Sequence, residues 1–117
     1  MMAQFCVDNE LQIREIGLPA ARQAVDLAPE DAANLDILGQ VMSALQDEIS
    51  AERFLQQAID KDLDFAPARL HLAQLYLRQG RLDWARYHLA LAARPVGQAS
   101  EANMLAQRLL ARYFGTP

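Results

Sequence analysis

Two consecutive stretches of the chain share one pattern: residues 32–65 read AANLDILGQVMSALQDEISAERFLQQAIDKDLDF, and residues 66–99 read APARLHLAQLYLRQGRLDWARYHLALAARPVGQA. The second stretch begins 34 positions after the first, which we call one repeat length. When the second is laid over the first, the small and apolar positions agree, for example Leu38 with Leu72 and Ala51 with Ala85. A repeat of this length is typical of supersecondary units that bury their apolar faces against their neighbours.

The same spacing extends beyond these two stretches in both directions. Ala24, Ala58 and Ala92 stand one repeat length apart, so the pattern begins before residue 32. On the C-terminal side, the letters LAQ at residues 72–74 return at residues 105–107, one position short of a full repeat length. We therefore expect a partial unit at each end, with a single deletion in the register of the last one.

Each unit is predicted to contain two helices. Apolar residues recur at intervals of three and four, the spacing of an amphipathic helix. The turn of the second unit has Gly80, which suits a left-handed backbone conformation, whereas the first unit has Gln46 nearby and is expected to be slightly strained there. The predicted helices cover residues 32–45, 49–60, 68–79 and 82–93.

Composition supports an all-α protein of one domain. Of the 117 residues, 21 are Ala and 18 are Leu, while Val, Ile and Thr together number 10. Ala and Leu favour helices and β-branched residues favour strands, so an all-β or a parallel α/β fold is not expected. The chain has no long apolar run and no signal-peptide pattern, and Cys6 is its single cysteine. We expect a cytoplasmic protein without an intramolecular disulfide or a membrane partner.

The helix–turn–helix unit of this repeat length resembles the tetratricopeptide repeat. The positions that carry the resemblance are Leu35, Leu38, Gly39, Met42, Ala51, Leu55 and Ala58 in the first unit, and Leu72, Ala73, Tyr76, Ala85, Leu89 and Ala92 in the second. Arg69 and Leu63 depart from the family pattern, and Pro95 comes two positions late. The resemblance covers about residues 14–113 and implies an α-solenoid of antiparallel helix pairs with a C-terminal capping helix.

The resemblance divides the chain into four parts within one helical-repeat domain. These are an N-terminal segment with a partial repeat (1–31), two repeats (32–65 and 66–98), and a capping helix with a tail (99–117). Because Pro is tolerated only in the first turn of a helix, Pro19 predicts a helix from about Leu18 to Leu27, with a separate segment before Gly17. Ser100 is a predicted N-cap of the capping helix. Phe5 and Val7 could pack on the first helices.

In this family the first helices of successive units line a concave groove, so the resemblance implies a binding site for a peptide or protein segment. The implied groove residues are Asp36, Gln40, Ser43, Leu70, Gln74, Leu77, Arg78, Asn103 and Gln107. Gln40, Gln74 and Gln107 would form a ladder able to hydrogen-bond a peptide backbone. The alternative is that glutamine merely suits a solvated helix face. The groove has neither a Lys nor the pair of Asn that clamp a terminal carboxylate in one subfamily, so a chaperone C-terminus is not the expected ligand.

The charges are unevenly spread along the chain. Residues 1–66 have 13 acidic and 4 basic side chains, a net charge of −9, and residues 67–117 have 2 acidic and 7 basic ones, a net charge of +5. This asymmetry allows head-to-tail self-association or a structural role in a larger repeat scaffold. It also leaves open nucleic-acid binding through the Arg-rich half, and a drift in surface charge without any role.

The sequence contains no pattern of an enzyme, a metal site or a cofactor site. His71 and His88 lack the spacing of metal ligands, and we interpret them as partly buried or surface residues on different faces. Asp60, Asp62 and Asp64 alternate but lack the Gly and the bidentate Glu of an EF-hand loop. The aromatic residues among Leu at helical spacing are expected to lie in the core, namely Tyr76, Trp84, Tyr87 and Tyr113. We therefore expect a binding module that has no catalytic residue and needs no cofactor or metal.

Overall fold

A computed structural model describes residues 10–115, so Phe5, Cys6 and Val7 lie outside the described part of the chain. The described residues are mostly helical and contain no β-strand. The elements are η1, a π-helical segment (Ile13–Gly17), α2 (Leu18–Leu27), α3 (Ala32–Ala44), α4 (Glu48–Lys61), α5 (Ala66–Arg78), α6 (Leu82–Ala92) and α7 (Glu101–Phe114). None of the helices in this range is long and apolar enough to cross a membrane.

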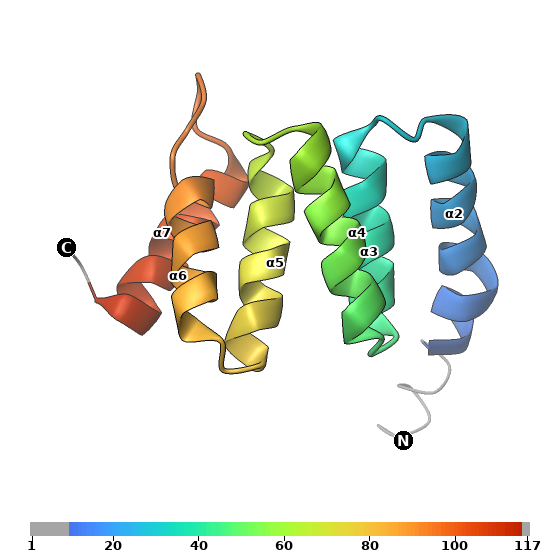
Figure 1. Ribbon diagram of the computed structural model, residues 1–117, viewed down its shortest axis with the longest axis horizontal. Coiled ribbons are helices and arrows are strands. Elements are labelled where there is room, and N and C mark those ends of the chain that lie inside the picture. The colour runs from blue at the N-terminus through green and yellow to red at the C-terminus, as the bar shows by residue number, and fades with distance from the viewer. Residues whose placement is uncertain (1–9, 116–117) are drawn as a thin grey trace.

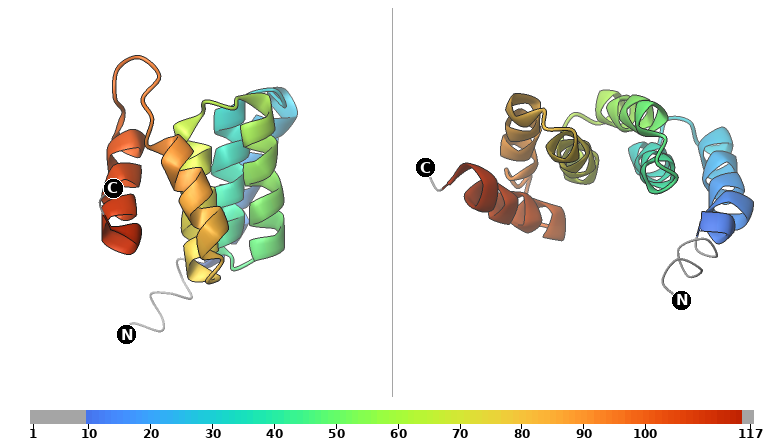
Figure 2. Two further views of the ribbon diagram at one scale, coloured as in Figure 1. Left: turned by 60° about the vertical axis from the view of Figure 1, so that its left-hand side comes forward. Right: turned by 90° about the horizontal axis from the view of Figure 1, so that it is seen from below.

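The helices pack as antiparallel neighbours in chain order, and together they form a curved row (Figures 1 and 2). The pairs α3–α4 and α5–α6 have the most extensive contacts, and α5 also contacts α3 and α7 along the inside of the curve. This arrangement is the expected α-solenoid, in which each helix pair packs only on its neighbours.

Small residues let the helices of a pair approach closely. Gly39 on α3 faces Leu55 on α4, and Ala51, Ala58 and Ala85 are completely buried. One apolar cluster extends from α2 to the start of α6, and a second joins α5, α6 and α7. The core is therefore continuous along the row and is built from the small and apolar positions that the repeat predicted.

The two turns that join the helices of a unit have the same backbone conformation. Gln46 has φ of 65°, and Gly80, at the equivalent position of the next unit, has φ of 75°. L-residues other than Gly incur a steric cost in this left-handed region. The expected strain at Gln46 is confirmed.

The helix at the N-terminal end is longer than expected. α2 spans Leu18–Leu27, as predicted from Pro19, but residues 10–12 are also helical and η1 joins them to α2 without a break. The N–H of Leu18 bonds to the carbonyl of Ile13, five positions earlier, which is a π turn. The expectation of a separate segment before Gly17 was wrong, because the π turn accommodates Pro19, which has no N–H to donate.

The C-terminal helix begins with the predicted cap. Ser100 Oγ accepts from the N–H of Asn103, and Asn103 Oδ1 accepts from the N–H of Ser100, forming a capping box. Burial fits the predicted deletion and an unbroken spacing alike. Completely buried Ala106 stands 33 positions after Ala73 and 34 positions after Leu72, and both of these residues are also completely buried. The deletion therefore stays a prediction.

The aromatic residues do not all lie in the core. Tyr76 is buried, and its hydroxyl donates to Glu52 Oε1 at 2.8 Å, which ties α5 to α4. Trp84, Tyr87 and Tyr113 are each more than half exposed, so their predicted core positions were wrong. Trp84 and Tyr87 are three positions apart on α6, and their rings pack edge to face on its exposed surface.

Candidate functional site

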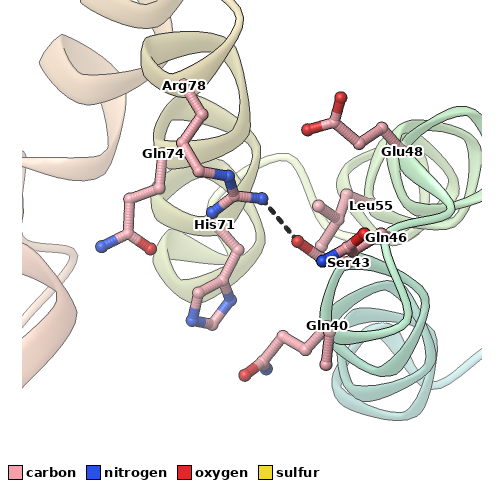
Figure 3. Close-up of a pocket in the computed structure, with 9 residues that line it drawn as sticks. Gln40, Ser43, Gln46, Glu48, Leu55, His71, Gln74 and Arg78 are labelled. Carbon is pink, nitrogen blue, oxygen red and sulfur yellow. Dashed lines mark hydrogen bonds between the residues drawn. The ribbon is translucent and has the colours of Figure 1, made fainter. Parts of the chain in front are cut away.

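The inside of the curve contains a hollow between α3 and α5, which we call the concave groove. It encloses about 760 Å³ and is floored by Leu55 of α4 (Figure 3). Side chains from α3 and α5 face each other across it, and the N-terminal end of α4 closes one side. Its lining residues are Gln40, Ser43, Ala44, Gln46, Glu48, Leu55, His71, Gln74 and Arg78.

A buried carboxylate holds two of the groove side chains in place. Asp36 is only 4% exposed, and its two oxygens accept from His71 Nδ1 at 2.8 Å and from Gln40 Nε2 at 3.0 Å. Because an ionised carboxylate only accepts hydrogen bonds, Nδ1 of His71 carries the proton. Nε2 is then the ring nitrogen available to a ligand, and the imidazole is fixed between α3 and α5.

Arg78 gives the groove its positive charge. Its Nη2 donates to Ser43 Oγ at 2.6 Å across the gap between α5 and α3 (Figure 3). Within residues 10–115 no carboxylate lies within ion-pair distance of this guanidinium. The other donors of Arg78 are therefore available to an acidic group.

A second hollow of about 490 Å³ continues the groove between α5 and α7. Pro67, Leu70 and His71 line it from α5, and Leu105 lines it from α7, together with residues 100–102. His71 lines both hollows, so it stands where the two parts of the inner surface meet. The inner surface thus changes from polar near α3 to more apolar near α7.

The predicted groove residues from α3 and α5 lie in this region, but their roles differ. Gln40, Ser43, Gln74 and Arg78 line the concave groove. Asp36 lies beneath it and positions its neighbours. Leu70 is buried and borders the second hollow, while Leu77 is half-buried and packs on both apolar clusters.

The structure places the two predicted groove residues of α7 elsewhere. Asn103 is only 3% exposed, and its amide donates to the carbonyls of Ala92 and Arg94, so it anchors α7 to the end of α6. Gln107 donates to the carbonyl of Ala93 and does not extend the ladder of Gln40 and Gln74.

Sequence reasoning missed the part that His71 plays in the groove. His71 was interpreted as an ordinary partly buried or surface residue, yet it pairs with Asp36 on the neighbouring unit. A signal was present, because the two residues are separated by one repeat length plus one position. Side chains at equivalent positions of adjacent units lie side by side in a solenoid, so a His and an Asp at this separation are candidates for pairing.

His88 and Arg69 form a second polar pair, which lies in the core. Arg69 Nη1 donates to His88 Nδ1 at 3.1 Å, and Arg69 Nε donates to the carbonyl of Leu63. Burial, and then the charge of Arg69, lowers the pKa of His88 from 6.5 to about 4. Neutral His88 is thus an acceptor that joins α6 to α5, and its role is structural.

No protein-family model matches the chain. A curated relative, cellulose synthase operon protein C of Xanthomonas axonopodis pv. citri (strain 306), is 38% identical over 97 residues. The match covers 79% of this chain and 6% of that relative, so the chain spans a small fraction of the length of the protein it resembles.

Proposed function

We propose that this chain is a tetratricopeptide-like helical-repeat module that binds an extended segment of another protein in its concave groove, without catalytic activity of its own. The observation that carries the proposal is the buried Asp36, which fixes His71 and Gln40 from below. Ordering these side chains before a ligand arrives lowers the entropic cost of binding.

The hydrogen-bonding groups of the groove suit a polypeptide backbone. Gln40 and Gln74 each have an amide that both donates and accepts, and the bond from Nδ1 of His71 to Asp36 leaves Nε2 available to a ligand. A peptide backbone likewise presents both donors and acceptors. Leu55 on the floor and Leu70 in the adjoining hollow give apolar side chains of the ligand a place to pack.

The charges favour a segment with acidic side chains. Arg78 lines the groove, and Arg108 and Arg112 are exposed on α7, the helix that borders the adjoining hollow. Glu48 is the acidic residue among those that line the concave groove. A carboxylate of the ligand near Arg78 would form charge-assisted hydrogen bonds.

The relative suggests a setting for this module. Its name refers to a cellulose synthase operon, and the match lies within a protein many times longer than this chain. We propose that the chain acts as a stretch of repeat scaffold, and that the bound segment belongs to a protein of a cellulose-producing assembly. The alternative is a purely structural stretch of scaffold, in which the groove stays empty.

Selection from a library of short random peptides tests the groove. We expect the purified chain to enrich peptides with acidic residues, and we expect Arg78→Glu and Gln74→Ala each to weaken their binding at least tenfold. Gln57→Ala is the matched control, because Gln57 is exposed on α4 and does not line the groove. Failure to enrich any peptide, or equal binding by all three variants, would contradict the proposal.

A further inference from the structure

Among residues 10–115, the helices at the two ends of the row have neighbours on one side only. Within residues 10–115, α2 packs on α3 and η1, and α7 packs on α6 and α5 (Figure 2). In contrast, α4 lies between α3 and α5, and α5 lies between α4 and α6. Comparing equivalent positions of these helices therefore reveals the faces that are incompletely covered.

On α2 the incompletely covered face is made of small residues. Gly17 and Ala24 are half-buried, whereas Ala51 and Ala58, their equivalents on α4, are completely buried. Ala20 lies between them on the same side of the helix and is exposed. This is the side on which α4 packs against the preceding helix of its own unit.

On α7 we identify the incompletely covered face by comparing residues that are one repeat length apart on α7 and α5. Met104 is 48% exposed, whereas Leu70, its equivalent on α5, is 4% exposed. Gln107 is exposed, whereas its equivalent Ala73 is completely buried. Leu70 and Ala73 belong to the cluster that contains Leu89 and Ala92 of α6, so the uncovered face of α7 is the one that a helix of the α6 type would cover.

We propose that a second copy of this chain packs its α2 on α7, so that the two helices form an intermolecular pair like α5–α6. α2 stands at the same place in the repeat as α4 and α6, because Ala24, Ala58 and Ala92 are spaced by one repeat length. The contact thus continues a packing that the chain already makes twice within itself.

The two faces are complementary in size. Gly17, Ala20 and Ala24 leave room on α2, and Met104 and Gln107 are exposed on α7. Large side chains on one helix that meet small ones on the other allow close packing. Within the chain, Gly39 on α3 likewise receives the large Leu55 of α4, with the small residue there on the first helix of the pair.

The two faces also belong to halves of opposite charge. The half of the chain that contains α2 has a net charge of −9, and the half that contains α7 has a net charge of +5. Unlike charges approach each other in a head-to-tail contact, which favours the encounter at low ionic strength. Such a contact uses different surfaces on the two copies, so each added copy leaves both end faces available and the assembly grows as a linear chain.

Sedimentation equilibrium of the full chain tests the proposal. We expect the average mass to rise with protein concentration without stopping at the dimer, and to fall above about 0.5 M salt, where the Debye length is roughly 4–5 Å. Ala20→Arg and Met104→Glu should each raise the dissociation constant at least tenfold. A monomer at high concentration and low salt overturns the proposal.

The matched control for Ala20→Arg is Ala90→Arg, since Ala90 is an exposed alanine on α6 away from both end faces. Equal weakening by the two variants overturns the proposal, because it indicates a general effect of charge. Circular dichroism of each variant establishes that it is folded before its mass is compared.

A cross-link tests the pairing of the two faces directly. Cys6→Ser, which removes the native thiol, provides the background for two single variants, Ala24→Cys and Met104→Cys. We expect disulfide-linked dimers to form much faster when the two variants are mixed than when either is oxidised alone. Equal rates in all three samples overturn the α2–α7 pairing.

Discussion

Gly39 of α3 lies directly against Leu55 of α4. A Cβ atom at position 39 would stand 2.7 Å from Leu55 Cγ and 3.3 Å from the backbone nitrogen of the same residue. Leu55 is almost completely buried, so it has little room to move away. The separation of α3 and α4 thus depends on the absence of a side chain at one position.

Gly39→Ala is therefore expected to destabilise the chain although alanine is the better helix former. Overpacking of this kind costs about 1–3 kcal/mol, which exceeds the roughly 0.5–1 kcal/mol gained when alanine replaces glycine within a helix. Urea unfolding followed by circular dichroism measures the difference. An unchanged or higher midpoint would show that α3 and α4 can separate at little cost.

Gly17→Ala is the matched comparison and should have the opposite sign. Gly17 also has helical backbone angles, and the nearest atom that an added Cβ would meet is the Ile13 Cγ2 at 4.0 Å. With no clash, the substitution should stabilise the chain by about 0.4–1 kcal/mol, because it restricts the unfolded state. A loss of stability would instead indicate that the π turn requires glycine.

Ala85→Leu tests the small positions of the second unit. Ala85 is completely buried, so the larger side chain should lower the free energy of unfolding by roughly 1–3 kcal/mol. Ala73→Leu should behave in the same way. Gln98→Leu, in an exposed loop, should change stability little. Similar melting temperatures for the buried and the loop variants would contradict the assigned packing.

Gln46→Gly should relieve the strain in the first turn. Gln46 has φ of 65°, a conformation that costs an L-residue roughly 1–2 kcal/mol and costs glycine nothing. After subtracting the entropic cost of ordering glycine, we expect the free energy of unfolding to rise by up to about 1 kcal/mol. The reverse change, Gly80→Gln, should destabilise the equivalent turn. Thermal melts of the two variants should move in opposite directions.

Acid should lower the stability of the folded chain, because protonation of His88 disrupts its pair with Arg69. The unfolded chain binds a proton at His88 near pH 6.5, whereas the folded chain binds it only near pH 4, because burial and Arg69 lower the pKa. Between these values the unfolded state binds more protons, so stability falls as the pH falls from about 6.5 to 4, by on the order of 2 kcal/mol.

The measurement is an NMR titration of the His88 ring together with unfolding curves across this range. His88→Gln should make the curve flatter, since the amide does not titrate. A normal pKa for the His88 ring would contradict the buried pair.

The helices and most of the core could be predicted from the order of the residues. The repeat spacing placed the helices, and the small residues at positions such as Ala51, Ala58 and Ala85 identified where they touch. Local chemistry also predicted the cap at Ser100 and the strain near Gln46. These features were predictable because helix periodicity, capping and turn conformation depend on neighbours within a few positions.

The tertiary structure alone decided which side of each helix contacts a neighbouring helix. Asn103 resembles a polar groove residue in sequence, but the capping box and two carbonyls at the end of α6 draw it into the interior. Trp84 is a large apolar residue of the kind expected in a core, but it is 55% exposed on α6. His71 became a groove residue through Asp36, which lies on another unit. In each case the outcome depends on contacts between helices, which a pattern along a single helix does not specify.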